Sequence, residues 1–183
     1  SEIGHFKGAN LPDVDTFRDS LHIVKEKFQK FKRTKNFLMY CTGGIRCEKA
    51  SAYMIANGYK NVYQLNGGII EYARQVKNQK IENKFIGKNF VFDNRRSERI
   101  SEEIISSCHQ CGNECDQHVN CNNDACNLLF LQCDKCRIKF YGCCGLDCKE
   151  IYSLPIEKQN KLRKGKKSIN TIFRKGRFNQ KAL

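Results

Sequence analysis

A short glycine-containing loop in the first half of the chain joins an apolar run to a helical pattern. The run at 36–40 predicts a buried strand, and residues 48–57 have the spacing of a helix. The loop between them begins at Cys41, contains two glycines and closes at Arg46. A strand-to-helix corner of this kind directs backbone N–H groups at one point, beside the positive end of the helix macrodipole. The sequence therefore predicts an α/β fold with an anion-binding corner.

The position of Cys41 in this corner predicts a reactive thiol. Nearby N–H groups and positive charge favour the thiolate, which is the nucleophilic form of cysteine. Gly43 and Gly44 allow backbone angles that a β-carbon disfavours, and Arg46 adds a fixed positive charge. A lone cysteine is more often a buried structural residue. Here the glycines, the arginine and the helix start together favour a site that lowers the pKa of a thiol.

The sequence Cys41-Thr42-Gly43-Gly44-Ile45-Arg46 resembles the active-site loop of rhodanese domains, which has the form C-x-x-G-x-R. In that superfamily the first cysteine accepts sulfur and carries it as a persulfide. Three parts of the chain together resemble the rhodanese-containing tRNA uridine-34 hydroxylases: CTGGIRCEKAS at 41–51, YQLNGGI at 63–69 and the cysteine-rich segment from Cys108. The resemblance extends from position 5 to about position 155.

The resemblance implies modification of tRNA, namely hydroxylation of the wobble uridine at C5 to 5-hydroxyuridine, with molecular oxygen as co-substrate. Cys41 would be the nucleophile or persulfide carrier, Arg46 would stabilise its charge, and Cys47 would be a resolving or second thiol. The loop backbone would hold the charged sulfur through Thr42, Gly43, Gly44, Ile45 and Arg46.

Two other functions fit the same residues. The first is a sulfurtransferase that moves sulfane sulfur from thiosulfate or a persulfide donor through Cys41. The second is a zinc-dependent RNA-binding module whose rhodanese part is inert, against which Cys41 and Arg46 argue.

Strand and helix patterns alternate through the first half of the chain. Apolar spacing predicts a helix over 13–32, a strand over 62–65, a helix over 69–76 and a hairpin or edge strand over 85–93. This alternation predicts a rhodanese-like parallel sheet with helices on both faces, followed by a small cysteine-rich zinc-binding region. In such sheets ligands bind beyond the carboxyl ends of the strands, which is where Cys41 falls.

The chain divides into four predicted parts. These are a rhodanese-like domain at 1–93, a linker at 94–107, a cysteine-rich zinc-binding module at 108–155 and a basic tail at 156–183. The opening residues resemble the rhodanese segment that follows the first strand of the domain. That strand is therefore expected to be missing, and we interpret the chain as part of a longer protein.

Ten of the twelve cysteines lie between Cys108 and Cys148. The C-x2-C pairs beginning at Cys108 and Cys133 are typical of zinc knuckles, in which four N or S ligands surround one ion. We predict one or two structural zinc ions. The favoured ligand sets are Cys108, Cys111, Cys133 and Cys136 for the first, and Cys121, Cys126, Cys144 and Cys148 for the second. Cys115, His118 and Cys143 are possible substitutes, and disulfides or free buried thiols are the alternative.

The formal net charge of +14 is unevenly distributed. Residues 157–183 hold ten Lys or Arg and one acid, which gives +9. A basic tail predicts a polyanionic partner, here tRNA. The predicted nucleic-acid-binding residues are Lys161, Arg163, Lys164, Lys166, Lys167, Arg174, Lys175 and Arg177. A solvated extension is the alternative, and the basic residues at 25–35 are a second candidate surface.

Composition also bears on location. Hydrophobic residues make up 40% of the chain, and no apolar run approaches the roughly 18 residues that span a bilayer. The first residues lack the basic-then-apolar pattern of a signal peptide. A chain that contains both a reactive thiol and a C-x2-C cluster is typical of a reducing compartment. We therefore expect a cytoplasmic protein with no membrane partner.

Overall fold

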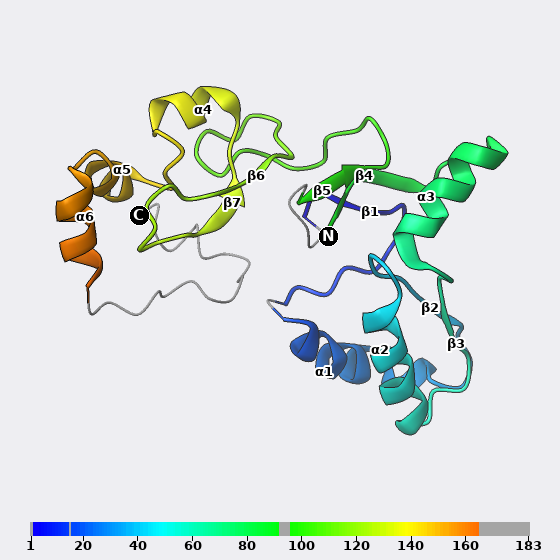
Figure 1. Cartoon of the computed structure of the whole chain (residues 1–183). Helices are drawn as coiled ribbons and strands as arrows, with labels where there is room; N and C mark the ends of the chain where they lie inside the picture. Colours follow the sequence, from blue (N-terminus) through cyan, green and yellow to red (C-terminus); the bar gives the residue numbers. More distant parts are fainter. Residues whose placement is uncertain (1, 15, 92–95, 165–183) are drawn as a thin grey trace. The chain divides into compact units, whose positions relative to one another are not determined.

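The computed structural model describes residues 2–14, 16–91 and 96–164 (Figure 1). They form two compact units, one within residues 3–102 and a second that comprises Glu2 and residues 103–164. The boundary falls inside the segment 94–107 that we interpret as a linker.

The first unit contains a parallel strand pair joined through a helix. Strand β2 (Phe37–Met39) pairs in parallel with β3 (Val62–Gln64), and α2 (Ile45–Ala56) connects them (Figure 1). Helix α3 (Gly68–Gln79) follows β3. These elements fall within two or three residues of the predicted ranges, and the predicted α/β class is confirmed.

Helix α1 (Phe17–Phe28) is shorter than the predicted 13–32 and continues as the 3-10 helix η1 (Gln29–Phe31). It begins after Thr16, whose Oγ1 accepts a hydrogen bond from the Asp19 N–H at 3.2 Å. None of its side chains is fully buried. Edge-to-face ring contacts from Phe28 through Phe37 to Tyr59 connect the helix to β2 and to the turn after α2.

A second, antiparallel sheet completes the first unit. Its strands are β1 (Gly4–Phe6), β4 (Phe85–Phe90) and β5 (Ser97–Arg99), in the order β1-β4-β5. The segment predicted as a hairpin or edge strand is therefore the central strand, paired on both sides. The Phe6 ring lies against Tyr40 at 4.8 Å, Tyr72 at 4.8 Å and Phe85 at 5.2 Å, which packs this sheet against the end of β2 and against α3.

The second unit is built around cysteines. It contains the antiparallel pair β6 (His118–Asn120) and β7 (Leu129–Leu131), and the helices α4 (Asp134–Lys139), α5 (Leu146–Tyr152) and α6 (Ile156–Arg163). Both of its buried clusters consist mostly of cysteine side chains, with few large apolar ones. A core this small gives little hydrophobic stabilisation, so bound metal is the expected source of folding free energy.

None of the helices in the described ranges combines the length and apolar character needed to cross a bilayer.

Candidate functional site

The loop that carries Cys41 lies between the end of β2 and the start of α2. Helix α2 begins at Ile45, three residues earlier than predicted, because the chain turns sharply at Gly44. Gly44 has a φ of 98°, in the left-handed region that residues with a β-carbon rarely occupy. The early start places Arg46 and Cys47 in the first turn of the helix, next to the Cys41 sulfur.

Backbone N–H groups converge on the Cys41 sulfur. The Gly44 N–H donates to Sγ at 3.1 Å, and the N–H groups of Arg46 and Cys47 are also directed at it. Partial burial of Cys41 raises the pKa of its thiol, but these N–H groups and the Cys47 thiol outweigh that effect and lower the pKa overall. Cys41 is therefore the thiol of the loop that ionises first.

Cys47 lies under the loop and is only 3% exposed. Burial raises the pKa of its thiol to about 12, and the hydrogen bond to Cys41 and the charge on Cys41 act in the same direction. At neutral pH Cys47 is thus a protonated hydrogen-bond donor to the Cys41 sulfur. The two thiols therefore differ in exposure and in the direction of their pKa shifts.

The N-terminus of α3 holds the loop from the other side. The Ile69 N–H donates to the Cys41 carbonyl at 3.0 Å, and the Ile70 N–H donates to the Thr42 carbonyl at 3.2 Å. Gly68 has a φ of 66°, and a β-carbon there would lie 2.6 Å from the Cys41 carbonyl oxygen and 2.5 Å from that of Thr42. Because the carbonyls are held by α3, the loop N–H groups remain directed at the sulfur.

Thr42 connects the loop to the antiparallel sheet. Its Oγ1 donates to the Phe90 carbonyl at 3.0 Å and accepts from Arg46 Nη2 at 3.2 Å. Arg46 is exposed, so its guanidinium lies at the loop surface with one N–H held by Thr42. Beside it, Gly43 faces open space and Ile45 is 72% exposed, which leaves the mouth of the site accessible.

The contributions of α3 and β4 were not predicted from the sequence. No contact is predicted from the sequence for the glycine pair before α3, although two adjacent glycines at a helix start are a signal of close backbone approach. Nothing in the local pattern indicates that Thr42 reaches β4, because the partner lies 48 residues away in the chain.

The cysteines of the second unit form two groups of four. One contains Cys108, Cys111, Cys133 and Cys136, and the other contains Cys121, Cys126, Cys144 and Cys148; within each group all Sγ atoms lie within 4.8 Å of one another. These are the two sets favoured by the sequence. Cys115, His118 and Cys143 belong to neither group. All twelve cysteines are free thiols, so the disulfide alternative has no support here.

The sulfur spacing fits tetrahedral zinc. Four thiolates at about 2.3 Å from one zinc ion lie about 3.8 Å from each other. Three Sγ–Sγ distances within the groups are 3.6 Å for Cys111–Cys133, 3.7 Å for Cys126–Cys144 and 3.7 Å for Cys144–Cys148. A disulfide needs about 2.05 Å, so these distances match shared coordination of an ion and not covalent pairing.

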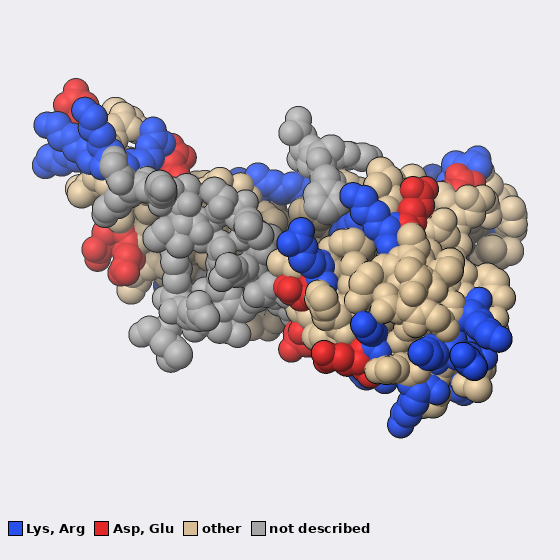
Figure 2. Space-filling view, turned by 90° about the horizontal axis from the view of Figure 1, so that it is seen from below, with Lys and Arg blue, Asp and Glu red and all other residues tan. Residues whose placement is uncertain are grey.

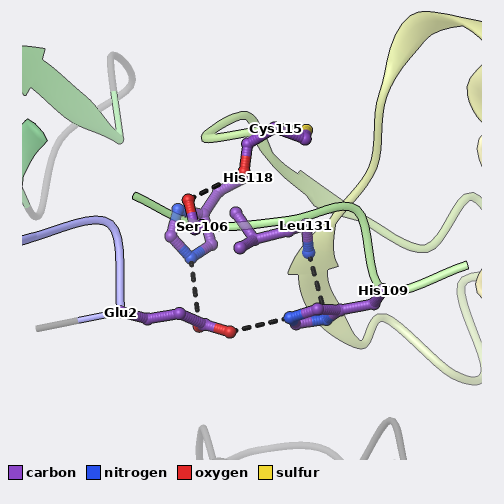
Figure 3. Close-up of polar contacts among 6 residues, drawn as sticks. All are labelled: Glu2, Ser106, His109, Cys115, His118 and Leu131. Carbon is purple, nitrogen blue, oxygen red and sulfur yellow. Dashed lines mark hydrogen bonds and ion pairs between the residues drawn. The ribbon is translucent and has the colours of Figure 1, made fainter. Parts of the chain in front are cut away.

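The carboxylate of Glu2 lies between the imidazoles of His109 and His118 (Figure 3). Glu2 accepts from His109 Nε2 at 2.7 Å and lies 4.0 Å from His118 Nε2, while the Leu131 N–H donates to His109 Nδ1 at 3.3 Å. Since Nδ1 accepts, the ring proton is on Nε2 and is donated to Glu2. This hydrogen bond lowers the pKa of Glu2 despite its partial burial. Both ring nitrogens of His109 therefore form hydrogen bonds. These bonds hold His109, which directly follows Cys108, in place.

Two family models match the chain. The model described as "Rhodanese-like domain" matches residues 2–75, and the model described as "Rhodanase C-terminal" matches residues 86–149. The chain belongs to the rhodanese superfamily. The Cys41 loop lies in the first matched region, residues 2–75. Both cysteine groups lie in the second, residues 86–149.

This rhodanese-superfamily chain is similar to curated proteins named tRNA uridine(34) hydroxylase. The one from Leptospira interrogans is 55% identical over 181 residues, 99% of this chain and 49% of that protein. Those from Yersinia pestis (strain Pestoides F) and Pectobacterium carotovorum are 55% and 53% identical over 176 residues, 96% of this chain and 49% of each protein. The predicted resemblance is confirmed. The chain spans about half the length of the curated relatives it matches.

The predicted nucleic-acid-binding residues are only partly within the described structure. Lys161 and Arg163 lie in α6 and Lys164 follows it. Arg163 Nη1 forms an exposed ion pair with Asp124 Oδ2 at 3.0 Å. The remaining five lie outside the described residues: Lys166, Lys167, Arg174, Lys175 and Arg177.

Proposed function

We propose that the protein containing this chain hydroxylates uridine 34 of tRNA to 5-hydroxyuridine, with molecular oxygen as co-substrate, and that the Cys41 loop is its reaction centre. The names and similarity of the curated relatives support the reaction class. The convergence of backbone N–H groups on the Cys41 sulfur supports the position of the centre. As a tRNA-modifying oxidoreductase with reduced cysteines, the protein would act in the cytoplasm.

Each residue of the loop has a proposed function. Cys41 is the nucleophile or persulfide carrier, since its thiol has the lowered pKa and its sulfur is half-exposed. Negative charge on that sulfur, or on a sulfur bonded to it, is stabilised by the N–H groups of Gly44, Arg46 and Cys47. The Arg46 guanidinium at the surface of the loop adds a positive charge for an anionic substrate group. Cys47 keeps its proton and donates it as a hydrogen bond.

The two cysteine groups are proposed to bind one structural zinc ion each. Four thiolates close a tetrahedral site and leave no position for substrate. Zinc in these sites would stabilise the second unit and take no part in the reaction. The basic tail is proposed as an additional tRNA contact.

Nucleoside analysis tests this function. Cells that lack the full-length protein are complemented with the wild type, Cys41→Ser or Cys47→Ser, and 5-hydroxyuridine at position 34 is measured by mass spectrometry of tRNA digests. The proposal expects the product with the wild type and with Cys47→Ser, and none with Cys41→Ser at equal protein abundance. Full activity in Cys41→Ser would remove Cys41 from the reaction and direct attention to Cys47.

A sulfurtransferase is the second candidate, because a loop that stabilises a sulfur anion suits a persulfide equally well. In that reaction the Cys41 thiolate bonds to the sulfane sulfur of thiosulfate and sulfite leaves; an acceptor thiolate or cyanide then takes the sulfur and restores the thiolate. Thiocyanate formation from thiosulfate and cyanide, without 5-hydroxyuridine in the same preparation supplied with tRNA and oxygen, would favour this candidate. RNA binding without either activity would favour an inert rhodanese part.

A further inference from the structure

A group of basic side chains lies at the end of α1 and the start of β2. We call it the α1–β2 basic patch; it consists of Lys25, Lys27, Lys30, Lys32, Arg33, Lys35 and Lys60. Six of the seven are exposed, and Lys32 is half-buried. Figure 2 shows Lys and Arg side chains gathered on part of the surface, at the lower right of that view.

The fold brings two separate segments together in this patch. The Lys60 N–H donates to the Lys32 carbonyl at 3.0 Å, and the Phe37 N–H donates to the Asn61 carbonyl at 2.8 Å. The turn after α2 is thereby held beside the turn that follows η1. The basic character is thus a property of the folded surface and not only of one stretch of sequence.

The charge of the patch is not balanced locally. Seven basic side chains and one acid, Glu26, give these positions a net charge of +6. Within the described part of the chain, none of the seven forms an ion pair. Lys25 and Lys27 lie in the last turn of α1, where cations interact favourably with the helix dipole, but the other five lie beyond that helix. Uncompensated like charges attract a polyanion.

The patch and Cys41 lie at opposite ends of the same strand. Lys35 precedes β2 and Cys41 follows it, six residues further along the chain, so they are separated by at most about 20 Å. Both belong to the first compact unit. An RNA with one nucleotide at the Cys41 loop therefore has neighbouring phosphates within reach of the patch.

We propose that the α1–β2 basic patch binds backbone phosphates of the tRNA whose uridine is modified at the Cys41 loop; this rests on the proposed function. Phosphate contacts fix the orientation of a nucleic acid without reading its sequence. The patch therefore positions the substrate, while selection of the uridine occurs at the loop. It is a different surface from the basic C-terminal tail.

The test uses the full-length protein and a tRNA transcript with uridine at position 34. The patch variant combines Lys30→Gln, Arg33→Gln and Lys35→Gln. The control variant removes the same charge from exposed positions of the first unit outside the patch, through Lys7→Gln, Arg18→Gln and Lys77→Gln. Equal thermal unfolding of the three proteins shows that the fold is unchanged.

Binding is measured as a function of salt. Each lost phosphate contact reduces the slope of log K against log salt by about 0.7 to 0.9, so three lost contacts reduce it by about two to three. At 0.15 M salt the same counterion release amounts to a loss of about 100-fold in affinity. The control variant should retain the wild-type slope and affinity. Equal slopes for the patch variant and the wild type, or an equal loss in the control, would overturn the proposal.

Two further measurements distinguish a failure of the patch proposal from a failure of the proposed function on which it rests. In a 5-hydroxyuridine assay the patch variant should raise KM with little change in kcat, and iodoacetamide should alkylate its Cys41 at the wild-type rate. If the wild type forms no 5-hydroxyuridine but the salt slopes still differ, the proposed function fails and the RNA-binding patch remains. If the patch variant loses binding to vesicles of anionic phospholipid while its tRNA binding is unchanged, the patch is a lipid-binding surface and the proposal is wrong.

Discussion

The reactivity of Cys41 should depend on the thiol of Cys47. Replacing Cys47 by Ala removes the S–H donor but keeps the backbone N–H groups that also face the sulfur. A hydrogen bond to a charged group contributes about 1.5–3 kcal/mol, so its loss reduces the thiolate fraction of Cys41 by about 13- to 160-fold at pH values below its pKa. A thiolate of higher pKa is also more nucleophilic, and this offsets nearly half of the effect on a logarithmic scale. The expected net decrease in alkylation rate is about 4- to 16-fold.

The assay is iodoacetamide alkylation of Cys41 between pH 5 and 10, followed by peptide mass spectrometry. The pKa of Cys41 should rise in Cys47→Ala, so the rate should fall at low pH and converge with the wild type at high pH. Cys47→Ser is the matched control: it keeps a donor in nearly the same volume and should retain most of the reactivity. An unchanged pH profile in Cys47→Ala would refute the conclusion that the buried thiol stabilises the Cys41 thiolate.

The remaining predictions concern the support of the loop and the metal sites. Gly68→Ala should destabilise the protein by about 3 kcal/mol or more and slow Cys41 alkylation, because a β-carbon there meets backbone carbonyls that cannot move aside. Gly8→Ala, at a similar φ of 72° with nothing within 4 Å of the added carbon, should cost only about 1–2 kcal/mol, and equal losses would contradict the steric explanation. Elemental analysis of protein purified without chelator should find two zinc ions per chain, and Cys108→Ser and Cys144→Ser should each remove one. Metal-free protein with an intact second unit by circular dichroism would contradict this prediction.

Local chemistry accounts for what the sequence predicted well. The strand and helix that flank Cys41 follow from hydrophobic spacing interrupted by two glycines, which are local signals. The same holds for the first cysteine group, because each of its two C-x2-C turns brings two sulfurs together whatever the rest of the chain does. Cys126 belongs to no C-x2-C pair but was included in the second favoured set, and the structure places its sulfur 3.7 Å from that of Cys144.

The features that the sequence did not reveal depend on contacts between distant segments. Strand β4 is central because it pairs with two strands. One is β5, and the other is β1, which lies some 80 residues earlier in the chain. Helix α1 showed an apolar stripe that predicts a buried face, yet none of its residues is fully buried within the described chain. Its true start at Thr16 depends on a hydroxyl-to-backbone hydrogen bond, for which several nearby polar residues compete.

The hydrogen bonds between α3 and the Cys41 loop also make the loop observable in solution. The Ile69 and Ile70 amide protons are held by the carbonyls of Cys41 and Thr42, so they exchange with solvent deuterium only when loop and helix separate. Their exchange rates therefore measure the free energy of opening the site, without any label on the reactive sulfur. Modification of that sulfur on the solvent side leaves both amides protected, whereas a reaction cycle that requires the loop to open would expose both together.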